Sequence, residues 1–160
     1  MPSRKIDDLC PQTATKVKAF LLACDQRGIE LLVTCTYRSF EEQDALYKQG
    51  RTSPGRIVTG AQAGSSFHNV RRALDVAILR PDTGVLDWEW LDEPESKVYW
   101  RILREIGEAQ GLHWGGDWDR PDKPHFEDQF CSPCGEIVGP RDARHFSESG
   151  LCVKLADKNP

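Results

Sequence analysis

An apolar run at residues 73–79, "ALDVAIL", carries a single carboxylate, Asp75. A short apolar run bounded by turn residues predicts a β-strand with a buried face. A histidine, His68, lies seven residues upstream, near the end of the polar segment 51–72. Loops of this length inside a compact domain are usually either functional or disordered. The strand and the long loop before it therefore indicate a candidate functional site.

The remaining patterns predict an α+β fold, with a small antiparallel sheet and helices packed on it. Pro11 suits the first turn of one helix and Gly28 follows its end. Ser39 and Glu42 have the spacing of a capping box, which begins a second helix. The segments concerned are helices at 11–27, 39–50 and 94–110, and strands at 29–37, 73–79 and 112–118.

Composition limits the classes of function. A chain of 160 residues fits one domain with a real core. The net charge of −4 argues against a nucleic-acid partner, because such domains are usually basic. No apolar run approaches the roughly 20 residues of a membrane span, so membrane insertion is not expected. The first twenty residues lack the apolar core of a signal peptide, so we expect synthesis in the cytoplasm.

Four residues carry candidate chemistry: His68, Asp75, Asp122 and His125. Two histidines and one carboxylate are a common ligand set for catalytic zinc. A further carboxylate beside the metal, Asp122, could act as a general base. Structural alternatives remain open: Asp75 could pair with Arg71 or Arg72, and His125 could be a surface turn residue.

The combination resembles a family of zinc peptidases that act on peptidoglycan. Its members include D-alanyl-D-alanine carboxypeptidases and the L-alanyl-D-glutamate endopeptidases of phages and bacilli. The resemblance rests on "TYRSFEEQDALYKQGR", "SFHNVRRALD", "HWGGDW" and "DKPHFE", which together span well over half of the chain. The long segment before His68 favours the L-alanyl-D-glutamate branch. The resemblance implies a Hedgehog/DD-peptidase-like fold.

Roles follow from the resemblance position by position. It implies that His68, Asp75 and His125 bind zinc and that Asp122 is the general base. It also implies that Arg38 holds the oxyanion or the substrate carbonyl, and that Ser66 is a hydrogen-bonding neighbour of the site. One position departs from the family: Arg71 stands where a glycine is usual, and an arginine would strain a turn that needs positive φ.

The tryptophans of "HWGGDW" are ambiguous. Trp114 and Trp118 could line a substrate groove, and packing in an aromatic core is at least as good an explanation. Of the two, Trp114 is the substrate-binding candidate.

The C-terminal segment contains a second group of metal-binding residue types. Cys131, Cys134, His145 and Cys152 supply four soft ligands, which resembles a structural zinc site. Free thiols or a disulfide are the alternatives. We therefore expect a zinc peptidase domain at residues 1–128 and an extension at 129–160, with one catalytic zinc and a second, structural zinc in the extension.

The sequence thus predicts a zinc-dependent peptidase of the peptidoglycan stem peptide, cutting the L-Ala–D-Glu bond as a phage or prophage endolysin released by a holin. A D-Ala-D-Ala carboxypeptidase would need the same zinc and base. An alternative of another class is a non-catalytic zinc-ribbon or cell-wall-binding module. We expect a monomer whose partner is the stem peptide.

Overall fold

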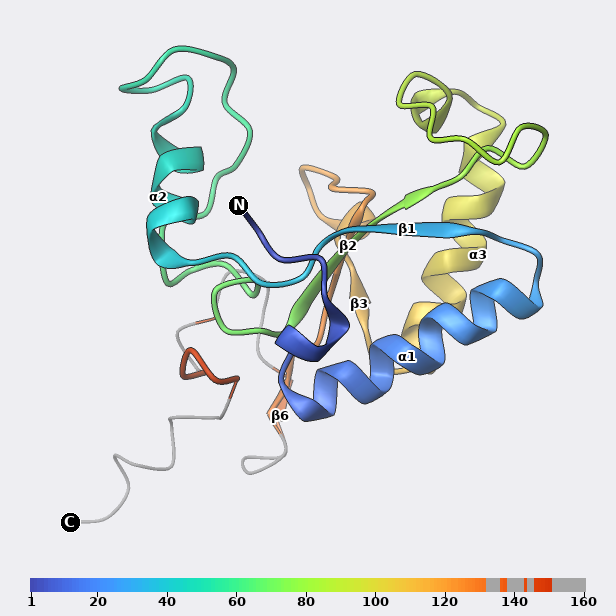
Figure 1. The fold of residues 1–160 in the computed structure, drawn as a ribbon, viewed down its shortest axis with the longest axis horizontal. Coiled ribbons are helices and arrows are strands. Elements are labelled where there is room, and N and C mark those ends of the chain that lie inside the picture. The colour runs from blue at the N-terminus through green and yellow to red at the C-terminus, as the bar shows by residue number, and fades with distance from the viewer. Residues whose placement is uncertain (132–135, 138–142, 144–145, 151–160) are drawn as a thin grey trace.

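The computed structural model describes residues 1–131, 136–137, 143 and 146–150. A four-stranded antiparallel sheet forms the centre, in the order β1-β2-β4-β3 (Figure 1). Its strands are β1 (Leu31–Cys35), β2 (Ala73–Ile78), β3 (His113–Trp114) and β4 (His125–Glu127). The helices are α1 (Pro11–Gln26), α2 (Phe40–Lys48) and α3 (Ser96–Ala109). The predicted α+β class is confirmed.

Short elements complete the described part of the chain. Three 3-10 turns occur at Ile6–Asp8, Trp90–Asp92 and Gly115–Asp117. A two-stranded ribbon pairs β5 (Phe130–Cys131) with β6 (Glu136–Ile137). No helix in the described residues is long and apolar enough to cross a membrane.

Helices α1 and α3 pack together and cover one face of the sheet with the main core. Phe20 of α1 and Phe126 of β4 meet with ring centroids 4.8 Å apart. Gly107 of α3 lies against the same ring: a Cβ at this position would be 2.9 Å from Phe126. The glycine therefore lets α3 approach β4 closely, which fixes the strand that carries His125.

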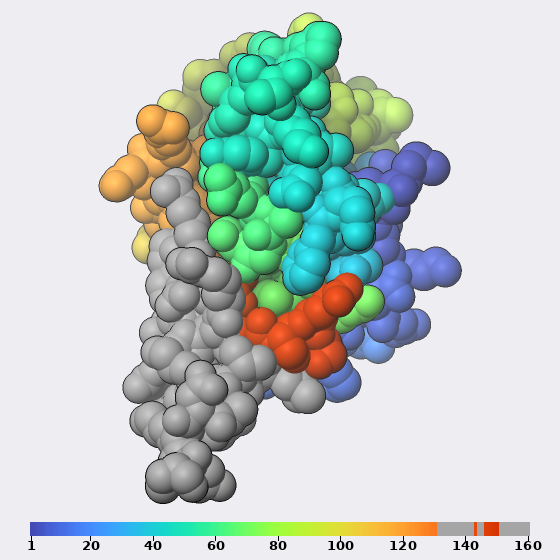
Figure 2. Space-filling model, turned by 90° about the vertical axis from the view of Figure 1, so that its left-hand side faces the viewer, coloured from blue at the N-terminus to red at the C-terminus, as the bar shows by residue number. Residues whose placement is uncertain are grey.

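The opposite side carries α2 and the long loop that follows it (Figure 2). The predicted capping box begins α2: Glu42 N donates to Ser39 Oγ (3.2 Å), and Ser39 N donates to Glu42 Oε2 (3.0 Å). Gln43 of α2 is buried and donates from Nε2 to Ala61 O at 2.7 Å. These bonds hold the loop at residues 51–72 against the helix.

The described residues of the C-terminal extension pack on the loop before β2. Phe146 and Ala143 form a second core cluster with Phe67, Val70 and Ala73. Arg72, which is buried, donates from Nη1 to Gly150 O (2.9 Å), and its guanidinium lies 4.2 Å from the Phe146 ring centroid. The extension therefore contacts the segment that joins His68 to β2.

Candidate active site and metal centre

The register of the sheet brings two candidate ligands together. On the antiparallel strands β2 and β4, Asp75 stands directly opposite His125. Side chains alternate between the faces of a strand, so Leu74 and Phe126 enter the helical core while Asp75 and His125 face the other side. His125 Nδ1 lies 3.0 Å from Asp75 Oδ1.

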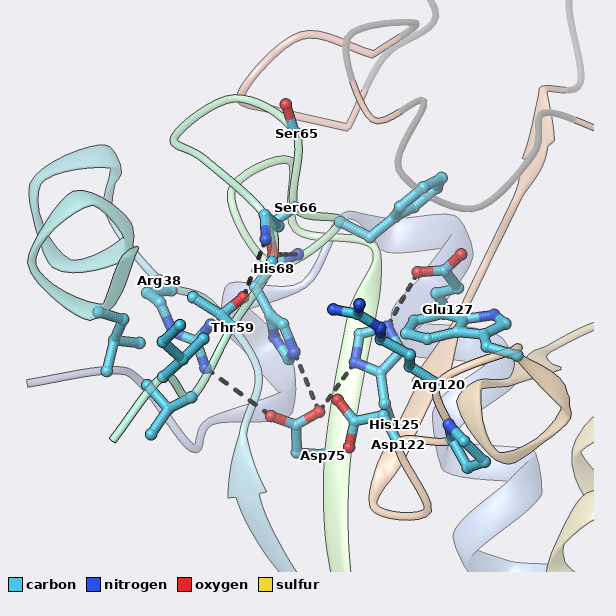
Figure 3. A pocket seen from close by; sticks show the side chains of 18 residues that line it. Arg38, Thr59, Ser65, Ser66, His68, Asp75, Arg120, Asp122, His125 and Glu127 are labelled. Carbon is cyan, nitrogen blue, oxygen red and sulfur yellow. Dashed lines mark hydrogen bonds and ion pairs between the residues drawn. The ribbon is translucent and has the colours of Figure 1, made fainter. Parts of the chain in front are cut away.

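His68 reaches the same carboxylate from the long loop. Its Nε2 lies 3.0 Å from Asp75 Oδ1, so one carboxylate oxygen faces two imidazoles (Figure 3). The loop is held by backbone bonds on both sides: Arg72 N donates to Phe67 O (2.9 Å), and Arg38 N donates to His68 O (3.3 Å). Ser66 lies beside it, and its Oγ accepts weakly from His68 N at 3.4 Å.

The second nitrogen of each imidazole has its own acceptor. His68 Nδ1 is 2.8 Å from Thr36 O, and His125 Nε2 is 2.9 Å from Glu127 Oε2. An N–H donated to each acceptor leaves a lone pair on His68 Nε2 and on His125 Nδ1. Such bonds fix the tautomer and orientation of metal-binding histidines. The three residues therefore fit a metal ion of the zinc type.

The cluster is strongly charged without a metal. Burial by itself would lower the pKa of His68, but the charge of Asp75 and the hydrogen bond to it raise the pKa to about 9. Burial would raise the pKa of Asp75, and the two imidazoles hold it well below its usual range instead. Because metal ligands must be deprotonated, metal binding here would release protons.

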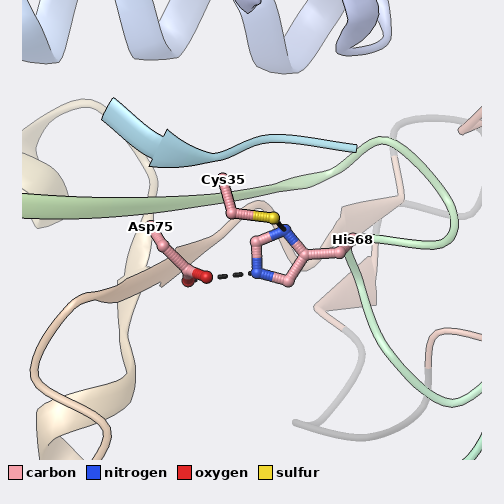
Figure 4. Close-up of side chains that lie close together, drawn as sticks. All are labelled: Cys35, His68 and Asp75. Atoms are coloured by element: carbon pink, nitrogen blue, oxygen red, sulfur yellow. Dashed lines mark hydrogen bonds and ion pairs between the residues drawn. The ribbon is translucent and has the colours of Figure 1, made fainter. Parts of the chain in front are cut away.

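A further neighbour of the site is Cys35 of β1. It is buried, and it stands opposite Asp75 on β1. Ligand atoms of Cys35, His68 and Asp75 lie within 4.8 Å of one another. However, Cys35 Sγ lies 3.5 Å from His68 Nδ1, whereas Asp75 contacts Nε2 (Figure 4). The thiol is thus at the other end of the ring, which favours His125 as the third ligand.

A pocket of about 590 Å³ opens over these residues. Its wall includes Arg38, Ser66, Trp118, Arg120 and Asp122. Figure 3 shows Asp122 beside Asp75 and His125. Partial desolvation raises the pKa of Asp122 above its usual value, although His125 acts in the opposite direction.

A close backbone contact positions Asp122. Asp122 N donates to Gly115 O at 2.9 Å. A Cβ on Gly115 would lie 2.7 Å from Asp122 O and 3.1 Å from His125 Cβ. The first glycine of "HWGGDW" is therefore required where two segments meet, and the "HWGGDW" and "DKPHFE" motifs form one unit.

Arg38 lies across the pocket from Asp122 (Figure 3). Its Nη1 donates to Gln43 Oε1 (2.8 Å), and its Nη2 is 3.8 Å from Asp75 Oδ2. Its Nε is buried and has no partner among the described residues. Asn69, next to His68, donates from Nδ2 to Arg38 O at 2.8 Å. The guanidinium is thus fixed beside the candidate metal site.

The structure does not bring Trp114 to this pocket, contrary to the sequence interpretation. Trp114 turns toward the helical face, where its ring stacks on Trp100 and its Nε1 donates to Lys123 O (2.7 Å). Trp118 lines the pocket instead, with its ring centroid 5.0 Å from that of His125.

The adjacent arginines do not partner Asp75. Arg72 pairs with buried Asp128 (2.9 Å). Arg71 has a φ of 59°, the left-handed conformation that glycine adopts easily. Its guanidinium donates to Asp8 O (2.8 Å) and stacks over Tyr37 at 3.8 Å. These contacts help to offset the backbone strain.

Glu127 contacts His125 and was not among the ligands expected from the sequence. Its carboxylate also accepts from Gln129 Nε2 (2.6 Å), so it is held in place beside His125. The two-residue spacing on one strand face was the available signal. Of the proposed tail site, Cys134, His145 and Cys152 lie outside the described residues, and only the backbone of Cys131 is described. That site stays a prediction.

Comparisons with known proteins place these features in context. A family described as D-alanyl-D-alanine carboxypeptidase matches residues 59–128. Peptidoglycan L-alanyl-D-glutamate endopeptidase CwlK of Bacillus subtilis (strain 168) is 42% identical over 122 residues, which cover 75% of this chain and 73% of that protein. L-alanyl-D-glutamate peptidase of Listeria phage A118 is 27% identical over 76% of this chain, but over only 38% of its own length.

Solved structures share the fold. The L-Ala D-Glu endopeptidase ChiX of Serratia marcescens superposes with a TM-score of 0.54 at 20% identity, over 81% of this chain and 90% of that one. The LD-carboxypeptidase LdcB superposes with a TM-score of 0.57 at 15% identity, over 92% of this chain and 67% of that one. At these identities, the likeness establishes the fold alone.

Proposed function

Because this chain belongs to the zinc peptidase family of D-alanyl-D-alanine carboxypeptidases and L-alanyl-D-glutamate endopeptidases, we propose that it hydrolyses the L-Ala–D-Glu bond of the peptidoglycan stem peptide. The observation that carries this choice of bond is the 42% identity to an L-alanyl-D-glutamate endopeptidase over most of both chains. The smaller likeness to a phage L-alanyl-D-glutamate peptidase points to the same bond.

His68, Asp75 and His125 would hold the zinc ion. Their convergence on one carboxylate oxygen, with both outer nitrogens bonded to acceptors, supports this assignment. A zinc ion at such a site lowers the pKa of water and polarises a carbonyl group. Glu127 would keep His125 oriented for binding, as carboxylates beside metal-binding histidines do.

Asp122 would be the general base. Its place in the pocket wall next to Asp75 and His125 supports this role. It would take a proton from the attacking water and give it to the leaving amine, so that the peptide nitrogen departs neutral. The raised pKa of its carboxyl group suits a residue that must also act as an acid.

Arg38 would stabilise the charge that develops on the carbonyl oxygen. A fixed guanidinium acts in this way without reorganisation during the reaction. Its bond to Gln43 and the backbone bonds around it supply that rigidity. Ser66 would line the substrate side of the pocket near His68.

Two alternatives remain distinct from this proposal. A D-Ala-D-Ala carboxypeptidase would use the same zinc, base and arginine, and the family description includes that activity. A non-catalytic wall-binding module would have no use for Asp122 in the pocket wall. We also propose that the protein acts as a monomer on the cell wall. We further propose an endolysin role with holin-type release, and the similarity to a peptidase of a phage supports the endolysin part.

Digestion of purified peptidoglycan tests the function. The zinc-loaded protein should release stem peptides with a new N-terminal D-Glu, identified by mass spectrometry. Loss of terminal D-Ala alone would assign the carboxypeptidase activity. Binding to the wall with no new product would leave only the interaction module.

A further inference from the structure

Arg120 is a cation in the pocket wall that has no part in the chemistry above. It lies on the loop that leads into β4, two residues before Asp122. Figure 3 shows its side chain extending from that loop over His125 into the pocket. Arg38 and Arg120 are the two arginines among the described residues that line this pocket.

The two arginines differ in their burial and in their hydrogen bonds. Arg38 is nearly buried and bonded to Gln43. Arg120 is exposed, and within the described residues it forms no ion pair or hydrogen bond. Two half-buried arginines elsewhere are paired with acids: Arg80 with Asp82 and Asp87, and Arg104 with Glu108 and Asp117.

The acids near Arg120 do not hold it. Glu127 is occupied by His125 and Gln129, and Asp122 lies outside ion-pair distance of the guanidinium although it lines the same wall. Pro121 follows Arg120 directly and restricts the backbone of the loop. Among the described residues, the guanidinium of Arg120 thus has no partner in the pocket. A planar guanidinium binds carboxylates with two parallel hydrogen bonds.

The position of Arg120 indicates which part of the substrate it meets. Asp122 would return a proton to the leaving nitrogen, so the leaving residue lies against the loop that carries Asp122. Arg120 is on that same loop. In the stem peptide, D-Glu continues through its γ-carboxyl group, so its α-carboxylate is free and sits on the carbon that bears the leaving nitrogen.

We propose that Arg120 binds the α-carboxylate of the leaving amino acid and is a specificity-determining residue. This inference rests on the proposed function. It predicts a preference for stems with D-isoglutamate over stems in which this carboxylate is amidated to D-isoglutamine. A terminal D-alanine offers the same carboxylate next to its leaving nitrogen, so a D-Ala-D-Ala peptide forms a separate arm of the test.

Kinetics on defined peptides test the proposal. The zinc-loaded wild type and the variants Arg120→Gln and Arg120→Lys are compared on L-Ala–γ-D-Glu–L-Lys, on its D-isoglutamine counterpart, and on a peptide ending in D-Ala-D-Ala. Arg101→Gln is the matched control, because Arg101 is exposed on α3 and does not line the pocket. Zinc content and the unfolding midpoint are measured for each variant.

Arg120→Gln should lower kcat/KM for the carboxylate peptide by about 10- to 100-fold, the scale of a lost hydrogen bond to a charged group. The amide peptide should be cut by the variant nearly as fast as by the wild type. Arg120→Lys should recover part of the preference. A merely structural arginine would not change the ratio between the two peptides. An equal loss on both, or no loss on either, would overturn the assignment.

Failure of the proposed function gives a different result. If the wild type cuts only the D-Ala-D-Ala peptide, the bond assignment is wrong, and the same ratio test is applied to that peptide and its C-terminal amide. If the wild type cuts none of the peptides, calorimetry measures how tightly it binds γ-D-glutamyl-L-lysine and the amidated form of this dipeptide. Tighter binding of the acid by wild type than by Arg120→Gln supports the proposal, and equal binding contradicts it.

Discussion

Asp75 and His125 stand directly opposite one another on two antiparallel strands, with His125 Nδ1 3.0 Å from Asp75 Oδ1. The backbone register alone sets this pair. His68 then joins the same oxygen from a loop that is bonded to Arg38, just before α2, and to Gln43 of α2. Two ligands on rigid strands and one on an anchored loop make a site whose geometry depends little on side-chain freedom.

Substitutions of His125 and Cys35 should show which of the two residues is the third ligand of the zinc ion. His125→Ala should lose the zinc of this site and the peptidase activity, because two protein ligands remain where catalytic zinc usually has three. Cys35→Ser should keep the metal, because the thiol lies at the Nδ1 end of His68. Metal analysis of both variants is the measurement. Loss of zinc in Cys35→Ser with retention in His125→Ala would reverse the assignment.

Substitution of the general base should lower catalysis without loss of the bound zinc. Asp122→Asn should retain the zinc and lower kcat by roughly 10²–10⁴-fold, the usual cost of a lost general base. Asp119→Asn is a matched control on the same loop, since Asp119 is exposed and does not line the pocket. An Asp122→Asn protein that lacks zinc would make Asp122 a ligand.

The capping box and the turn residues could be predicted from the sequence because they act locally. The helix predicted at 11–27 is observed at Pro11–Gln26, and the Ser39–Glu42 capping box forms as expected. The strand expected at 112–118 is restricted to His113–Trp114. The two glycines that follow form a 3-10 turn, because Gly115 must approach Asp122.

Contacts between residues far apart in the sequence could not be predicted from the spacing of the motifs. The motif "SFHNVRRALD" places His68 and Asp75 near each other, but only the register of β2 and β4 puts His125 opposite Asp75. The register of β1 and β2 places Cys35 opposite Asp75 as well. The direction of Trp114 depends on its stacking against Trp100 of α3, which the sequence pattern does not specify.

The strain at Arg71 can be measured with two substitutions. Arg71→Ala removes the bond to Asp8 and the stacking on Tyr37 but keeps a side chain at φ 59°. Arg71→Gly removes the same contacts and also the strain. The glycine variant should be more stable than the alanine variant by about 1 kcal/mol in urea unfolding. Equal stabilities would show that the turn stores no strain.

The extension should bind a second zinc ion if its predicted ligands are correct. We expect two zinc ions per folded chain, and one in the variant that combines Cys131→Ser with Cys134→Ser. The variant should also be less stable, because a short segment relies on its metal for folding free energy. Metal analysis gives the stoichiometry. One zinc ion in the wild type, with tail thiols that react freely in the folded protein, would remove the second site.

X-ray absorption at the zinc edge tests the central site most directly. The sample is the zinc-loaded variant with Cys131→Ser, Cys134→Ser and Cys152→Ser, so that no tail thiol contributes. With His68, Asp75 and His125 as ligands, the first shell should contain only nitrogen and oxygen at about 2.0–2.2 Å. A sulfur neighbour at about 2.3 Å would place Cys35 on the metal and contradict the assignment.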